Sequence, residues 1–307
     1  MQTKPGRFQS KNFKIAYSFI VLIIAAGILS YLIYSQREVL IAYDWDIDWT
    51  LVFISFIVFS LDLLLVVIVW TWLMNSMAKK LNFSVHFVYY SISNITKRIP
   101  GTIWYIASRA QLYKSNQIDY KITTVTSGVE YAIATLSSVL VSLVFAIPII
   151  IDFGYSPYLF IFVILIGSIL VHPRFISWVF KKLNIEATSL SYRLIIQSLV
   201  LYTLIWILGG VVLFFIAKSI YPLEFSNLPY VIGAWSIVGF ITSVLLFLPT
   251  NLGLTEVGIS LLLTNIMPSS IAVIIAVVAR IFITVFELVW ASLSFFAQKR
   301  RDNPKVL

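Results

Sequence analysis

Long runs of apolar residues, separated by short polar segments, make up most of this 307-residue chain. A helix needs about 20 apolar residues to cross the hydrocarbon of a bilayer. Uninterrupted runs predict helices at 13–35, 49–76, 123–151, 157–171 with a continuation toward 180, 190–218, 228–248 and 270–297. A further stretch, 83–115, is broken at Pro100-Gly101, and a second break from Pro249 to Gly253 precedes a short apolar piece at 254–266. The pattern predicts an all-α polytopic membrane protein in which residues 1–307 form one membrane domain.

The composition excludes a water-soluble globular protein. Sixty per cent of the residues are hydrophobic and 11% are charged, whereas about 25% are charged in soluble proteins. The chain has no cysteine, which excludes disulfides, zinc knuckles and thiol chemistry, and its two histidines are too few for an all-histidine metal site. We therefore expect no metal and no other cofactor.

The distribution of charge predicts the orientation in the membrane. Nineteen of the 22 basic residues lie in the N-terminal tail, around Lys79-Lys80, along 97–121, at 174–193 or after residue 297. Because basic residues collect in cytoplasmic loops, we expect a plasma-membrane protein whose tails, 1–12 and 298–307, are both cytoplasmic. The net charge of +9 has the same origin. Its division among five short segments argues against nucleic-acid binding.

This orientation predicts two hairpins. Lys79-Lys80 and the segment 114–121 are both inside, so 83–115 must enter the membrane and return, bent at Pro100-Gly101. Segment 228–267 must likewise enter from outside and return, which predicts about six full spans plus two re-entrant hairpins. The halves 1–152 and 155–307 then share one plan in opposite orientation, as in the inverted repeats of secondary transporters. No residue-level repeat supports this plan, and eight plain spans are the alternative.

The two breaks predict a cavity between the halves. Non-helical backbone at membrane depth needs protein or a water-filled cavity to satisfy it. The second arm of each hairpin starts at its break, where free N–H groups favour an anion such as phosphate. Arg98 and Arg109 lie around the first break and are candidates to hold that phosphate, and Trp104 is a candidate to line the cavity. Lys97 fits better as a residue that extends its amine to the membrane surface.

Several ionisable residues lie within or next to apolar runs, where a charge is costly without a partner. They are Asp62, Glu130, Glu256, Arg280 and Glu287. Arg280 and Glu287 are seven residues apart on one face of the last span, so both can face one cavity, and Arg280 is predicted to pair with Glu256 or Glu130. The alternative is a structural pair that sets helix register, which is favoured for Asp62. Aromatic residues near the span ends fit belts at the membrane interfaces, among them Trp45, Trp49, Trp70, Trp72, Tyr89 and Tyr90.

An ordered set of motifs resembles one membrane-protein family. The string Arg98-Ile99-Pro100-Gly101-Thr102-Ile103-Trp104, with Arg109, resembles the "PG..W....R" signature of the lysylphosphatidylglycerol synthase transmembrane-region family, also called flippase-like or YbhN-like (UPF0104). The string from Phe247 through Pro249 and Gly253 to Glu256 resembles its "P.GLG..E" signature. Glu130 falls where the family often has an acidic residue. Arg280 and Glu287 match the Arg and Glu of its final span.

The resemblance implies a protein that binds or translocates a phospholipid or lipid-linked glycan, with membrane lipids as its partners. The implied headgroup-binding or cavity residues are Arg98, Pro100, Gly101, Trp104, Arg109, Glu130, Pro249, Gly253, Glu256, Arg280 and Glu287, and none is catalytic. Some members carry a soluble aminoacyl-transferase domain that attaches lysine to phosphatidylglycerol. That domain is absent from the 307 residues, so lysyltransferase activity is not expected. Thr250-Asn251 replaces the small or Gly-rich residues usual after the second proline, a change that could alter substrate preference.

Two other functions stay open. A membrane glycosyltransferase that uses polyprenyl-phosphate sugars could employ the outward acidic segment Asp44-Trp45-Asp46-Ile47-Asp48 to bind a divalent metal or to act as a base. Exclusion of basic residues from an outward loop is the favoured explanation of that segment. The second alternative is a non-catalytic membrane subunit of a lipid or glycan synthesis pathway, acting with pathway proteins or as a homo-oligomer.

Overall fold

The computed structural model describes residues 37–98, 104–147, 158–183, 190–244 and 251–302, together with Tyr34 and Ile149. Every regular element in these ranges is a helix, which confirms the predicted all-α fold for this part of the chain. The predicted first span at 13–35 lies outside the described residues except for Tyr34. Pro100, Gly101 and Pro249, at the two predicted breaks, also lie outside them.

The long helices follow the apolar runs closely. They are α3 (Trp49–Met77), α6 (Tyr120–Phe145), α10 (Tyr192–Lys218) and α13 (Ser269–Asp302). The shorter helices are α4 (Phe83–Ile95), α5 (Trp104–Lys114), α8 (Tyr158–Leu170), α9 (Pro173–Lys182), α11 (Leu228–Val244) and α12 (Asn251–Leu263). A six-residue helix α2 (Arg37–Ala42) and two 3₁₀ turns, η1 (Thr96–Arg98) and η2 (Phe225–Asn227), complete the list for the described residues.

By length and composition, five of the described helices can cross a membrane, or six if a bent pair counts as one span. The bent pair is Ile164–Leu170 with Pro173–Lys182, whose axes differ by 52°. The predicted continuation of run 157–171 toward 180 is therefore helical but not straight. Pro173 lacks the N–H that a continuous helix would use, and His172 caps the new helix through its ring nitrogen.

Polar residues just before the apolar runs set where the helices begin. Asp48 accepts hydrogen bonds from Thr50 N at 2.9 Å and Leu51 N at 3.3 Å, and so caps α3. Asp119 accepts from Lys121 N at the start of α6. Such side chains satisfy N–H groups that the first helical turn leaves without partners. The helix starts are thus determined locally, which explains why the sequence predicted them well.

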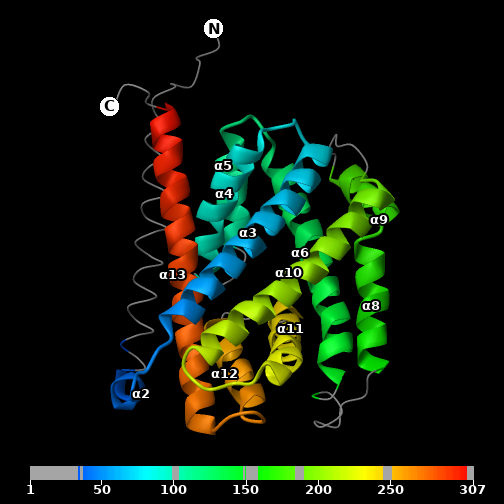
Figure 1. Ribbon diagram of the computed structural model, residues 1–307. Helices are drawn as coiled ribbons and strands as arrows, with labels where there is room; N and C mark the ends of the chain where they lie inside the picture. Colours follow the sequence, from blue (N-terminus) through cyan, green and yellow to red (C-terminus); the bar gives the residue numbers. More distant parts are fainter. Residues whose placement is uncertain are drawn as a thin grey trace.

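The long helices run along the bundle, while two pairs of short helices occupy its opposite ends (Figure 1). Helices α4 and α5 pack side by side near the end where α13 finishes, and α11 and α12 pack near the end where α13 begins. At 1.5 Å per residue, the 13 residues of α4 and the 11 of α5 extend about 20 Å and about 16 Å. Neither is long enough to cross the ~30 Å of bilayer hydrocarbon alone.

Glycines allow α11 to approach its neighbours closely. A Cβ atom on Gly210 of α10 would lie 2.6 Å from the Cα of Ile232, and one on Gly233 of α11 would lie 2.5 Å from the carbonyl oxygen of Phe145. Both contacts are with backbone, which cannot move aside as a side chain can. Small residues at such crossings are typical of helices that pack in a membrane. The short helix α11 is therefore held firmly against α10 and the end of α6.

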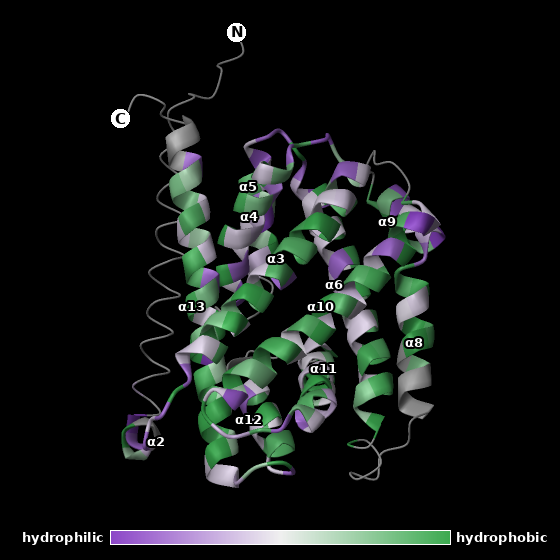
Figure 2. Ribbon diagram, viewed as in Figure 1, coloured by the Kyte–Doolittle hydropathy of each residue, from purple (hydrophilic) through white to green (hydrophobic). Residues whose placement is uncertain are grey.

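The outer surface of the bundle is apolar along its middle. On α3, Phe53, Ile57 and Leu61 are exposed, and Ile196 and Val200 are exposed on α10. Figure 2 shows that hydrophilic residues gather at the end that holds α9 and the loops beside α4 and α5. So many exposed large apolar side chains on the helices suit hydrocarbon rather than water. The fold is compatible with a polytopic membrane protein, as predicted from the composition.

Candidate functional site

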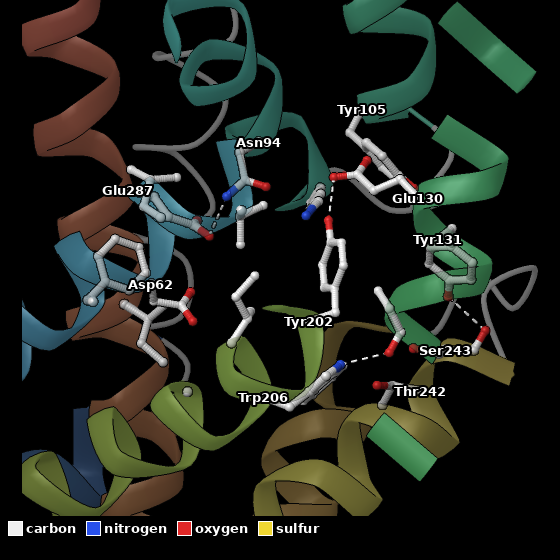
Figure 3. A pocket seen from close by; sticks show the side chains of 18 of the residues that line it. Asp62, Asn94, Tyr105, Glu130, Tyr131, Tyr202, Trp206, Thr242, Ser243 and Glu287 are labelled. Atoms are coloured by element: carbon white, nitrogen blue, oxygen red, sulfur yellow. Dashed lines mark hydrogen bonds between the residues drawn. The ribbon is translucent and has the colours of Figure 1, made fainter. Parts of the chain in front are cut away.

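A cavity of about 380 Å³ lies within the bundle, lined by residues of α3, α4, α5, α6, α10, α11, α12 and α13. Its size is within the range of small-molecule sites, which is roughly 300–1,000 Å³. Its walls carry charged groups, hydroxyls and aromatic rings as well as aliphatic side chains (Figure 3). The charged, polar and aromatic side chains that line it include Asp62, Tyr90, Asn94, Lys97, Glu130, Tyr202, Trp206, Trp235, Arg280 and Glu287.

Glu130 forms one polar wall of the cavity. Its Oε1 accepts hydrogen bonds from Tyr90 OH at 2.9 Å and from Tyr202 OH at 2.7 Å. Its Oε2 accepts from Nη1 of Arg109, with which it forms a buried ion pair. Four helices, α4, α5, α6 and α10, therefore meet at one carboxylate. A buried charge needs this degree of pairing because no water solvates it.

Arg109 lies behind Glu130, fully buried and away from the cavity. Its Nε donates to Ser93 Oγ at 3.0 Å. The guanidinium carbon lies 3.9 Å from the ring centroid of Tyr90, 4.4 Å from that of Trp70 and 5.0 Å from that of Tyr105. Three rings and one carboxylate thus enclose the cation. This geometry favours a structural role for Arg109 over direct contact with a ligand.

The second ion pair joins α12 to α13. Arg280 Nε lies 3.2 Å from Glu256 Oε1, and the two side chains are 17% and 13% exposed. Of the two partners that the sequence offered for Arg280, the structure selects Glu256. Arg280 lines the cavity, so unlike Arg109 it can be approached from inside. Among the arginines whose side chains the structure describes, it is the one that lines the cavity and can meet a negatively charged ligand.

The structure brings five of the predicted site residues together. Glu130, Arg280 and Glu287 line the cavity, Glu256 pairs with Arg280, and Arg109 pairs with Glu130. Arg98 lies in η1 and Gly253 in α12, where only their backbone is described. Trp104 begins α5, is 51% exposed and is not among the cavity-lining residues. Lys97, predicted to reach toward the membrane surface, lines the cavity instead, with Nζ 5.2 Å from the Tyr105 ring centroid.

Sequence reasoning misplaced several aromatic residues. Trp70, Tyr89 and Tyr90 were predicted in interfacial belts, and that prediction is wrong because all three are buried. Trp70 Nε1 donates to Tyr113 OH at 2.8 Å, and Tyr90 binds Glu130. Aromatic residues at a membrane interface and aromatic residues in the core of the bundle are of the same types, tryptophan and tyrosine. Both can lie near the ends of apolar runs, so the sequence does not distinguish them. A hydrogen-bond partner distant in sequence distinguishes them, and only the packing provides it.

The acidic segment 44–48 has a structural use. Asp48 caps α3, while Asp44 and Asp46 are exposed on either side of Trp45. Within the described residues, no group of three or more histidine, cysteine, aspartate or glutamate side chains is arranged to hold a metal ion. The segment therefore lacks, in that part of the chain, the ligand cluster that a metal-dependent transferase would use.

No protein-family model matches this chain, and neither does any curated protein. The resemblance in the sequence motifs therefore carries no independent support from these comparisons. The cavity and the helices around it are the features of this chain that bear on its function.

Proposed function

We propose that this protein binds the headgroup of a membrane phospholipid or lipid-linked glycan and carries it across the bilayer. The observation that carries the proposal is a charged and aromatic cavity enclosed by helices whose outer surface is apolar. Acyl or polyprenyl chains could stay in the hydrocarbon while the headgroup occupies the polar interior. In a membrane, ionisable residues facing an internal cavity mark a substrate or ion pathway by default.

The side chains of the cavity suit a headgroup that carries a phosphate together with amine or hydroxyl groups. Arg280 is the candidate phosphate ligand, because a guanidinium binds phosphate oxygens in two parallel hydrogen bonds. Asp62 and Glu287 offer acceptors for hydroxyl or ammonium groups. Trp206 and Trp235, whose ring centroids are 6.4 Å apart, offer flat apolar surfaces. These features fit the resemblance to the flippase-like family.

Two helix pairs at opposite ends of the bundle, α4 with α5 and α11 with α12, support a transport mechanism. Of these four helices, α11 together with η2 (Phe225–Val244) is also long enough to cross the membrane fully. In our proposal, α4 with α5 and α11 with α12 form re-entrant hairpins that enter from opposite sides, giving an inverted repeat around the cavity. The end that holds α4, α5 and α9 is the cytoplasmic one in this proposal. Basic residues at the helix ends there are exposed, as cytoplasmic loops require: Lys79, Lys80, Lys114, Arg174, Lys181, Lys182 and Arg193.

Reconstitution tests the proposal directly. Purified protein is placed in liposomes with fluorescent phosphatidylglycerol, phosphatidylethanolamine or a polyprenyl-phosphate glycolipid, and an impermeant quencher reports transfer between leaflets. We expect faster transfer of at least one lipid than in protein-free liposomes. The same rate with and without protein, for every lipid, would contradict the proposal.

A pair of variants locates the site. The double variant Arg280→Gln/Glu256→Gln removes the cation without leaving the glutamate unpaired, and should reduce transfer at least about tenfold, which is ~1.4 kcal/mol. Arg280→Lys keeps the charge and should retain part of the activity. Mass spectrometry of lipids that stay bound to the gently purified protein gives an independent readout. Wild type should be enriched in one lipid class, and the double variant should mirror bulk membrane lipid.

A further inference from the structure

The wall of the cavity that α10 and α11 form is uncharged. The described carboxylates, lysine and arginine that line the cavity all come from α3, η1, α6 and α13. Residues 245–250, which follow α11 and lie outside the described ranges, contain no acidic or basic side chain either. This wall therefore suits an uncharged part of a ligand. The residues that α10 and α11 contribute to it are Tyr202, Ile205, Trp206, Gly209, Trp235, Thr242 and Ser243.

Trp206 and Trp235 form the flat part of the α10–α11 wall. Their ring centroids are 6.4 Å apart and their planes are inclined at 52°, so neither ring stacks on the face of the other. Each indole lies where the opposite helix has a glycine. A Cβ on Gly239 would overlap the six-membered ring of Trp206, and one on Gly209 would overlap the five-membered ring of Trp235. Both tryptophans are only partly buried and line the cavity, so this packing fixes two aromatic surfaces beside it.

Hydrogen bonds join the α10–α11 wall to α6 and place a hydroxyl group beside the rings. Trp206 Nε1 donates to Ala134 O at 2.7 Å, which ties the indole to the turn of α6 that contains Thr135. Tyr131 OH, one turn earlier on α6, donates to the carbonyl oxygen of Ser243 at 2.7 Å (Figure 3). Thr135 lines the cavity, and its Oγ1 has no hydrogen-bond partner among the described residues. A buried hydroxyl in this state is costly because it has lost water without gaining a bond.

Aromatic faces with hydroxyls and no charge match the surface of a sugar ring. One face of a hexopyranose carries several C–H bonds, which rest on the electron-rich face of an indole, and its hydroxyls both donate and accept hydrogen bonds. A phosphate needs cationic or N–H donors, and the α10–α11 wall has no cation. A quaternary ammonium group also binds to aromatic rings, but it gains from a nearby carboxylate, and the α10–α11 wall contributes none. The chemistry of this wall therefore favours a sugar.

We propose that the α10–α11 wall, with Thr135 of α6, is a subsite for one uncharged sugar ring, so that the headgroup is that of a lipid-linked sugar. The lipid attachment rests on the proposed function, whereas the binding of a sugar at the two tryptophans does not. Trp206 and Trp235 contact the C–H groups of the ring, and the Thr135 hydroxyl bonds to a sugar hydroxyl. The phosphate of the same lipid lies toward the charged walls, where Arg280 is its candidate ligand.

The test compares three lipids that differ only in the group esterified to farnesyl phosphate: glucose, methyl or choline. All three keep one negative charge on the phosphate, and the choline ester adds a positive charge. Equilibrium binding of each radiolabelled lipid is measured on the full chain in a detergent without sugar, because a maltoside would compete for the subsite. Wild type should bind the glucosyl lipid at least about tenfold more tightly than the methyl lipid.

Variants at the two tryptophan-bearing positions of the comparison locate the sugar. Trp235→Leu removes one aromatic face and should bring the affinities for the glucosyl and methyl lipids within about threefold of each other. Trp235→Phe keeps an aromatic ring and should retain most of the preference. Trp72→Leu is the matched control, since Trp72 is 39% exposed and is not among the cavity-lining residues.

Thr135→Val gives a second, independent test. It removes a hydroxyl that has no partner in the described protein, so a purely structural role predicts an equal or higher melting temperature and unchanged binding. A sugar contact predicts the same melting behaviour together with a preference for the glucosyl lipid reduced at least about threefold. If Trp235→Leu fails to fold, as thermal unfolding will show, this variant decides.

Three results would overturn the proposal. The first is equal or undetectable binding of the glucosyl and methyl lipids by wild type. The second is tightest binding of the choline lipid, which would show that the rings hold a cation. The third is a preference for the glucosyl lipid that survives both Trp235→Leu and Thr135→Val, which would place the sugar elsewhere.

The lipid-transfer assay separates this subsite from the proposed function. Binding of the glucosyl lipid with the expected variant pattern, by a protein that transfers no lipid, would preserve the subsite and contradict transport. Transfer of phospholipids together with equal affinity for the three esters would preserve the proposed function and contradict the subsite.

Discussion

Tyr202 OH donates a 2.7 Å hydrogen bond to Glu130, and through it α10 is joined to the ion pair that anchors α5 and α6. Both groups are buried, and the acceptor is charged. Hydrogen bonds to buried charges contribute about 1.5–3 kcal/mol, more than those between neutral groups. This single contact links the cavity wall to the structural centre of the bundle.

Tyr202→Phe should therefore lower the free energy of unfolding by about 1.5–3 kcal/mol, because Glu130 loses one of its two phenol donors. Thermal unfolding in detergent, followed by size-exclusion elution, measures the change. Tyr192→Phe is the matched control, since its hydroxyl contacts His172 at an exposed position. Equal melting temperatures for the Tyr202 variant and the control would contradict the role assigned to the contact.

Removing one member of the Arg109–Glu130 pair should destabilise the protein by about 3–5 kcal/mol, because the partner is left as an uncompensated buried charge. Arg109→Met alone should therefore reduce the yield of folded protein sharply. The double variant Arg109→Met/Glu130→Gln should recover much of that loss. A double variant no more stable than Arg109→Met would show that the charge is not the cause, and expression with thermal unfolding measures both.

Gly233→Ala should destabilise the packing of α11, since the new Cβ would lie 2.5 Å from the carbonyl oxygen of Phe145. Overpacking of this kind costs roughly 1–3 kcal/mol. Gly128→Ala is the matched control on α6, where a Cβ meets no atom within 4 Å. The control should be neutral or stabilised by up to ~1 kcal/mol, because alanine favours helix more than glycine. A comparison of melting temperatures decides between these outcomes.

Asp48→Ala should cost about 1 kcal/mol through loss of the helix cap of α3, without abolishing lipid transfer. Asp44→Ala, in the same exposed segment, should change neither stability nor transfer. A transferase with its carboxylates in this segment predicts the opposite, namely loss of activity in both variants at unchanged stability. Thermal unfolding and the liposome assay on the same two preparations separate the two explanations.

The helices themselves were predictable because their causes are local. The apolar runs that form α3 and α10 match the observed bounds within a residue or two, since length, hydropathy and a capping Asp or Ser determine a helix without reference to the rest of the chain. Glu130, Arg280 and Glu287 were also identifiable from sequence as cavity residues, because a charge within an apolar run needs a partner or an internal cavity. The 52° bend before α9 was not predicted from the sequence, which indicated only that the run continues toward residue 180.

The partners of these residues were decided only by the tertiary structure. Glu256 rather than Glu130 pairs with Arg280 because α12 packs on α13. Glu130 pairs with Arg109 because α5 packs on α6. The burial of Tyr90 and the entry of Asn94 and Lys97 into the cavity depend on where α4 lies against α3, α6 and α13. The sequence by itself determined which segments become helices and which charges need partners. Only the packing of helices distant in sequence decided which pairs formed, because a side chain's partner is set by distance in space and not along the chain.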